Sequence, residues 1–98
     1  MTLDELFEII EDRKNNPQPG SYTYQLMEKG EDAILQKVGE ESVEVMLAAK
    51  GQGDQRVIEE VADLFYHTLV LLSSRGQNLR DVLAELERRH APSPRSTG

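Results

Sequence analysis

Two apolar helical stripes in this 98-residue chain each contain carboxylates. At about 100° per residue, one helical face carries the apolar residues Ile34, Val38, Val45 and Ala48. Glu41 falls in the middle of that face. A carboxylate on an inward-facing stripe is costly to desolvate unless it is paired or bound to a cation. The fold must therefore bury Glu41 beside something positive.

The second stripe repeats this anomaly in a helix expected at about residues 55–74. There Glu60, Asp63 and His67 share one face with Leu64. Two helices that both turn carboxylates inward repel each other unless a positive group lies between them. Hard divalent cations such as Mg²⁺ take oxygen ligands and are commonly held by a few carboxylates. The two stripes together predict a cation site.

The ligand set follows from the spacing of the acidic residues. Carboxylates three residues apart on each of two facing helices converge on one point, as they do in carboxylate-bridged helix bundles. The predicted Mg²⁺ ligands are Glu41, Glu44, Glu60 and Asp63. Glu40 lies further round its helix, and three roles stay open for it: a fifth ligand, a group behind the ligands, or the base that takes a proton from water.

The order E-E-x-x-E and then E-x-x-D resembles the signature of the all-α nucleotide pyrophosphohydrolases, the MazG-like superfamily. Over about residues 3–90 the chain is most similar to the phosphoribosyl-ATP pyrophosphohydrolase family. Two runs carry this narrower resemblance, Ser21-Tyr22-Thr23 and Ala62-Asp63-Leu64-x-Tyr66-His67. Ser42 stands where Ala is usual, a departure that touches no expected ligand.

The resemblance implies an enzyme that hydrolyses 1-(5-phosphoribosyl)-ATP to 1-(5-phosphoribosyl)-AMP and pyrophosphate, an early step of histidine biosynthesis. Bound Mg²⁺ would neutralise the phosphates and orient the nucleotide. The alternative is a house-cleaning pyrophosphohydrolase that acts on free or damaged nucleoside triphosphates with the same metal core. A helical dimer without enzymatic activity is a third reading, although the Glu-x-x-His pattern of di-iron bundles is missing from both acidic helices.

The predicted catalytic residues are Glu40 and Glu41. The resemblance also places a set of candidate substrate-binding residues near the phosphates and ribose: Lys37, Ser21, Tyr22, Thr23, Lys50 and His67. Lys37 stands one turn before Glu41, so it is suited either to an ion pair with a carboxylate or to a substrate phosphate. His67 follows Asp63 by four residues, so two other roles stay open for it: a hydrogen-bonded core residue or a metal ligand.

Composition excludes several other classes. Lys and Arg total 11 against 18 Asp and Glu, and the net charge of −7 argues against a nucleic-acid-binding surface. The absence of cysteine excludes thiolate metal sites. No apolar run is long enough to span a membrane, and the N-terminus lacks a signal-peptide pattern. A cytoplasmic protein is the expectation.

Capping and breaking residues divide the chain into four or five helices in an all-α fold. Helices are expected at residues 3–14, 22–29, 31–50 and 55–74 and from residue 79 onward, with Thr2, Ser21, Asp54 and Asn78 as N-caps. Residues 1–90 should form one pyrophosphohydrolase domain. Residues 91–98 are rich in Pro and Ser and are expected to form a disordered tail.

The two acidic helices carry more apolar faces than one small core can cover. Val43, Met46 and Leu47 lie outside the main stripe of the first, and Phe65, Leu69 and Leu72 form a surplus on the second. Soluble monomers rarely expose an apolar patch of that size. We therefore expect an antiparallel helix bundle that is completed by homodimerisation, as the resemblance also implies.

Overall fold

A computed structural model describes residues 1–91 of the chain, and within that range the fold is all-α. Its five helices are α1 (Leu3–Asn15), α2 (Tyr22–Lys29), α3 (Glu31–Gly51), α4 (Asp54–Ser74) and α5 (Leu79–His90). The predicted helices therefore agree with the structure to within a residue or two. Except for Ala91, the predicted tail lies outside the described residues.

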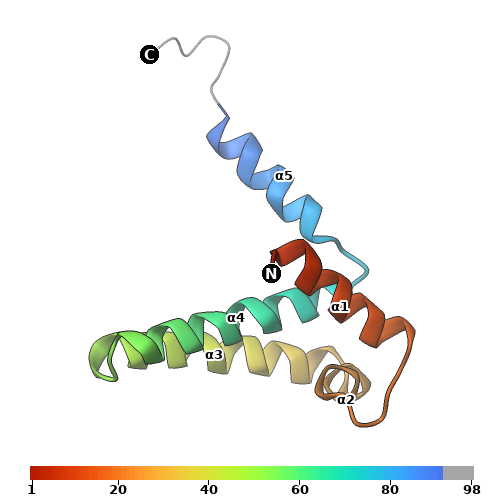
Figure 1. The fold of residues 1–98 in the computed structure, drawn as a ribbon, viewed down its shortest axis with the longest axis horizontal. Coiled ribbons are helices and arrows are strands. Elements are labelled where there is room, and N and C mark those ends of the chain that lie inside the picture. Colours follow the sequence, from red (N-terminus) through yellow and green to blue (C-terminus); the bar gives the residue numbers. More distant parts are fainter. Residues whose placement is uncertain (92–98) are drawn as a thin grey trace.

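The two longest helices, α3 and α4, run antiparallel and are joined by a short turn at residues 52–53 (Figure 1). Helices α1 and α2 pack at the end of this pair that lies away from the turn, whereas α5 projects away from the other helices (Figure 1). The two acidic stripes therefore face each other along the α3–α4 pair.

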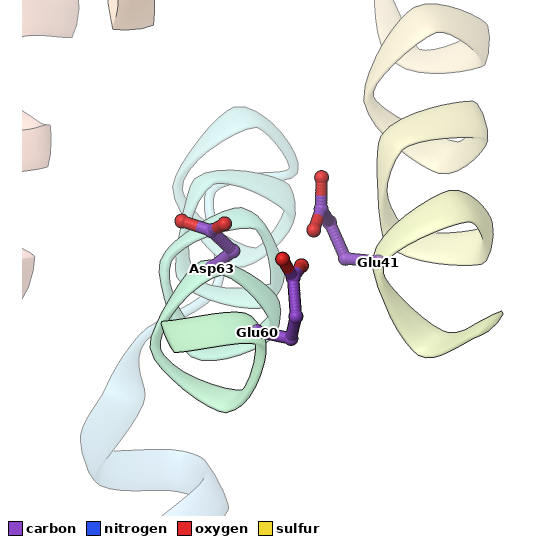
Figure 2. Close-up of side chains that lie close together, drawn as sticks. All are labelled: Glu41, Glu60 and Asp63. Atoms are coloured by element: carbon purple, nitrogen blue, oxygen red, sulfur yellow. The ribbon is translucent and has the colours of Figure 1, made fainter. Parts of the chain in front are cut away.

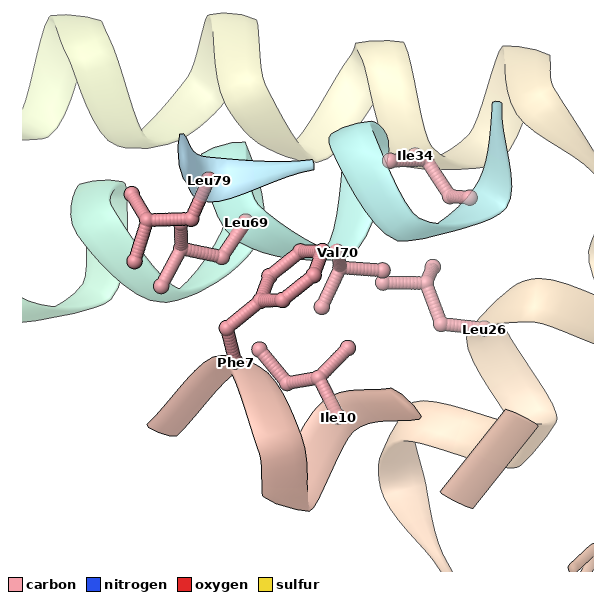
Figure 3. Close-up of a cluster of buried hydrophobic side chains, with 7 residues drawn as sticks. All are labelled: Phe7, Ile10, Leu26, Ile34, Leu69, Val70 and Leu79. Atoms are coloured by element: carbon pink, nitrogen blue, oxygen red, sulfur yellow. The ribbon is translucent and has the colours of Figure 1, made fainter. Parts of the chain in front are cut away.

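The apolar core lies where α1 and α2 meet the α3–α4 pair, and all five helices contribute to it (Figure 3). Its buried members are Phe7, Ile10, Leu26, Ile34, Leu69, Val70 and Leu79. Leu69 was expected on a surplus face, and that prediction is wrong, because its side chain is only 5% exposed. Leu69 lies in the core with Phe7 of α1 and Leu79 at the start of α5, and the sequence of α4 alone does not contain that information.

The helix ends follow their predicted capping chemistry with one exception. Thr2 and Glu5 form the predicted capping box, with the Glu5 amide 3.1 Å from Thr2 Oγ1 and the Thr2 amide 3.0 Å from Glu5 Oε1. Asn78 caps α5 through a 2.8 Å bond from the Arg80 amide. The predicted Asp54 cap is wrong: the N-cap is Gly53, whose φ of +92° is left-handed backbone that favours glycine.

Within residues 1–91, none of the five helices combines the length and the apolar character that crossing a bilayer requires. The expected cytoplasmic location stays a prediction.

Candidate functional site

Three carboxylates converge between the two long helices (Figure 2). Glu41 extends from α3 towards Glu60 and Asp63 on α4, and one oxygen of each side chain lies within 4.8 Å of the others. Glu41 is 8% exposed and Glu60 is 5% exposed, whereas Asp63 is open to solvent. The cluster is thus buried on one side and accessible on the other.

The packing of α3 explains why Glu41 lies inside. Its neighbours on the same helical face, Ile34 and Ala48, are 0% and 1% exposed, so this face is held against α4 along its length. On α4, a spacing of three residues turns Glu60 and Asp63 to the same side. The structure therefore brings together three of the four predicted ligands.

The electrostatics of the cluster favour either a proton or a cation. Burial raises the pKa of the Glu60 carboxyl, and the neighbouring carboxylates of Glu41 and Asp63 raise it further, against the opposing effect of Arg56. All three side chains offer only oxygen donors, which are the ligands that hard cations such as Mg²⁺ prefer. The donor set fits that ion, and an ion held there would stabilise the charged carboxylates.

Two basic side chains flank the cluster. Lys37 Nζ lies 3.4 Å from Glu41 Oε1 and 3.6 Å from Glu40 Oε1. Arg56 donates to Glu60 Oε1 at 2.7 Å and to Glu59 Oε1 at 2.6 Å. Arg56 was not among the predicted site residues, although its position four residues before Glu60 is a signal for an ion pair within the helix.

Glu44 and Glu40 lie outside the group of three. Glu44 is half-buried. The largest cause of the raised pKa of the Arg56 guanidinium is its hydrogen bond with Glu59, and the charge of Glu44 raises that pKa further. Glu40 is exposed and accepts a hydrogen bond from Gln36 Nε2 at 3.3 Å. Their predicted roles, as a ligand and as a catalytic group, stay predictions.

Helix α2 brings Tyr22 to the edge of the cluster. His67 Nδ1 lies 2.7 Å from the Asp63 carbonyl, so it donates there, and the Tyr22 hydroxyl donates to Nε2 at 2.8 Å. Burial raises the pKa of the Tyr22 hydroxyl. The nearby charge of Lys37 lowers that pKa, and the charge of Glu41 raises it. Because both of its ring nitrogens are hydrogen-bonded, His67 is engaged within the protein in this arrangement.

The other predicted substrate residues are distributed more widely. The Ser21 hydroxyl caps α2 by accepting from the Tyr24 amide at 3.2 Å. Thr23 is buried and hydrogen-bonds the Tyr66 hydroxyl. Lys50 is exposed in the last turn of α3. It lies about 13 Å beyond Glu41 along the helix at 1.5 Å per residue. The structure does not bring Lys50 to the carboxylates.

Comparison with known proteins gives the family. The sequence pattern of the family described as Phosphoribosyl-ATP pyrophosphohydrolase matches residues 3–90. A protein of Clostridium acetobutylicum named phosphoribosyl-ATP pyrophosphatase is 51% identical over 88 residues, which cover 90% of this chain and 80% of that protein. The protein of that name from Listeria welshimeri is 54% identical over 87 residues, 89% of this chain and 84% of its own length.

A longer relative from Gloeobacter violaceus is named histidine biosynthesis bifunctional protein HisIE. It is 50% identical over 88 residues, which cover 90% of this chain but only 39% of that protein. The same domain thus occurs both in short proteins and within a longer one. The chain belongs to the phosphoribosyl-ATP pyrophosphohydrolase family, a family of hydrolases.

Proposed function

We propose that this chain hydrolyses 1-(5-phosphoribosyl)-ATP to 1-(5-phosphoribosyl)-AMP and pyrophosphate, with Mg²⁺ held by Glu41, Glu60 and Asp63. The observation that carries the proposal is the convergence of these three carboxylates from two helices to within 4.8 Å, with two of them buried. Repulsion among buried carboxylates is a standing cost that a bound cation relieves. The names of the relatives supply the substrate and the pathway.

The chain's own residues divide the remaining work. Bound Mg²⁺ supplies charge neutralisation and orientation of the phosphate oxygens. Lys37, already beside Glu41, carries a half-exposed ammonium group that is placed for a substrate phosphate at the open side of the cluster. Glu40 is exposed next to it and is our candidate for the group that takes a proton from water. Glu44 is our candidate for a further ligand once the ion is bound.

We further propose that the working unit is a homodimer. Leu35, Val43 and Met46 are 46%, 49% and 59% exposed on one side of α3. Gly39 lies on that side, and apart from the backbone of its own helix no atom of residues 1–91 comes within 4 Å of the position that its Cβ would occupy. Packing within the chain therefore does not explain a glycine that costs a helix about 1 kcal/mol relative to alanine. The close approach of a partner's backbone would explain it.

An apolar groove supports the same proposal. It encloses about 490 Å³ between the α3–α4 pair and α5, and its lining includes Val38, Leu64, Phe65, Val82 and Leu86. Because Phe65 and Leu86 are 50% and 46% exposed, the chain leaves this surface open. Helices from a second copy would cover it and complete the bundle.

The decisive experiment measures pyrophosphate release from 1-(5-phosphoribosyl)-ATP and from a panel of nucleoside triphosphates, with Mg²⁺ and with a chelator. We expect Mg²⁺-dependent turnover that favours the phosphoribosyl nucleotide. Glu41→Gln and Asp63→Asn should each lower turnover at least about a hundredfold. Both should also shrink the rise in melting temperature that Mg²⁺ produces by binding the native state.

The control for these variants is Glu87→Gln, which makes the same change at an exposed position on α5. It should keep full activity and the full Mg²⁺ shift. All variants should retain helical circular dichroism. Undiminished turnover by Glu41→Gln would refute the ligand assignment, and faster turnover of ordinary triphosphates would favour the house-cleaning reaction instead.

A further inference from the structure

Arg56 occupies a distinctive place at the carboxylate cluster. It lies in the first turn of α4, and its guanidinium forms a fork with Nη1 on Glu59 and Nη2 on Glu60, at 2.6 Å and 2.7 Å. The Glu60 side chain is 7% exposed, whereas that of Arg56 is 47% exposed. A half-solvated cation thus reaches the more deeply buried of the two α4 carboxylates.

The contact with Arg56 occupies only one of the two oxygens of the Glu60 carboxylate. Arg56 hydrogen-bonds Oε1, and a carboxylate has two oxygens, so Oε2 of Glu60 accepts no bond from Arg56. Lys37 neutralises the cluster in the same way from α3, through Glu41. The metal-free cluster is therefore held by one cation from each helix.

We propose that Arg56 is the built-in counter-ion of the metal site: it neutralises Glu60 in the metal-free protein and lowers the affinity of the site for a divalent cation. The inference rests on the proposed metal site. It concerns a residue that belongs to none of the predicted ligand or substrate positions.

Two effects of Arg56 on metal binding oppose each other, and their relative sizes decide whether Arg56 weakens or strengthens that binding. Arg56 carries one positive charge and Mg²⁺ carries two. Repulsion between these charges about 6 Å apart, in a dielectric near that of water, weakens Mg²⁺ binding about tenfold. Holding a ligand in place would strengthen binding instead. Glu60, however, is already confined by burial, at 5% exposure, so the guanidinium adds little order. Repulsion therefore dominates, and removal of the charge should tighten metal binding.

The test measures the dissociation constant of Mg²⁺ alone, by calorimetry at fixed ionic strength, for the full chain and four variants. Arg56→Gln removes the charge, Arg56→Met removes it while keeping the aliphatic stem, and Arg56→Lys retains it. Arg88→Gln is the matched control, because Arg88 pairs with Glu85 within the exposed helix α5. We expect about tenfold tighter binding for the two neutral variants. Arg56→Lys should stay within about twofold of the parent chain, and Arg88→Gln should be unchanged.

A melting experiment supplies an independent readout. Metal-free Arg56→Gln should melt below the parent chain because Glu60 loses its partner, and saturating Mg²⁺ should close that gap. Unchanged or weaker Mg²⁺ binding in Arg56→Gln and Arg56→Met would overturn the proposal. Absence of Mg²⁺ binding by the parent chain would overturn it together with the metal site. Tighter binding without turnover of phosphoribosyl-ATP would sustain the inference and contradict the proposed function alone.

Discussion

Ser73 of α4 and Glu11 of α1 form a polar contact between two helices. Ser73 is fully buried, and its hydroxyl donates to Glu11 Oε2 at 2.8 Å. Lys14 completes the contact, with Nζ 2.8 Å from the same carboxylate oxygen and 3.0 Å from the Ser73 carbonyl. Burial by itself would raise the pKa of Glu11, but the bonds from Lys14 and Ser73 outweigh it and lower that pKa.

The lowered pKa predicts a pH-dependent contribution to stability. A carboxyl whose pKa is lower in the folded than in the unfolded state stabilises the fold above the unfolded value, about 4.3, and loses that contribution as pH falls through the folded value. Glu11→Gln should therefore reduce the unfolding free energy by about 1 kcal/mol at pH 7 and much less at pH 3. Urea unfolding at both pH values measures this. The control is Glu8→Gln, at an exposed position of α1, and an equal loss at both pH values for Glu11→Gln would contradict the assignment.

Single residues also show how far the sequence predicts the site. Glu41 was identifiable because it interrupts an apolar stripe, and its burial confirms that face. Arg56 was not, because a basic residue four positions from a glutamate is common on solvated helices. Whether Glu44 reaches the other carboxylates depends on how α3 and α4 are rotated against each other, and periodicity does not fix that rotation.

Helix α2 depends on its neighbours. Eight residues are too few for a stable isolated helix. Two hydrogen bonds tie its first turn to α4, from Tyr22 to His67 and between Thr23 and Tyr66. Leu26 anchors the next turn in the core. Docking on α4 therefore both stabilises α2 and places Tyr22 beside the carboxylates.

Thr23→Val tests that dependence. The change keeps the shape of the side chain but leaves the Tyr66 hydroxyl without its partner, so the unfolding free energy should fall by about 1–2 kcal/mol. Amide exchange should accelerate most in α2. The matched control is Thr68→Val: Thr68 is exposed, and its hydroxyl bonds only the Leu64 carbonyl of its own helix. Equal losses of stability in the two variants would show that the contact between α2 and α4 has no special weight.

Sequence patterns define the helices better than their arrangement. Caps and breakers predicted every helix to within a residue or two, because those signals are local. The projection of α5 was not predictable, since its stripe of Leu79, Val82, Leu83 and Leu86 finds only part of its cover in the chain. Leu79 is 4% exposed, whereas Val82 and Leu86 are 38% and 46% exposed. Leu69 was misassigned for a related reason: part of its cover comes from Phe7 of α1, which is distant in sequence.

At the scale of the whole molecule, the chain leaves apolar side chains open on both long helices and on α5. Val43, Met46 and Leu47 on α3 and Phe65 on α4 are each about half exposed, as the surplus-face argument anticipated. Leu72 is half-buried, so it contributes less. The open surface adjoins the helices that carry the carboxylates. A partner that covers it would therefore stabilise the geometry of the site as well as the fold.

Val43→Glu tests whether a second copy covers this surface. Val43 is 49% exposed and outside the core, so a carboxylate there is tolerated in an isolated chain but would be desolvated at an interface. We expect the parent chain to sediment as a dimer and the dissociation constant of the variant to rise at least about a hundredfold, a cost of about 3 kcal/mol. Turnover and melting temperature should fall with it, and each should recover at high protein concentration. Gln52→Glu adds the same charge at the exposed turn and should change neither. A parent chain that is fully active as a monomer at assay concentration would refute the dimer.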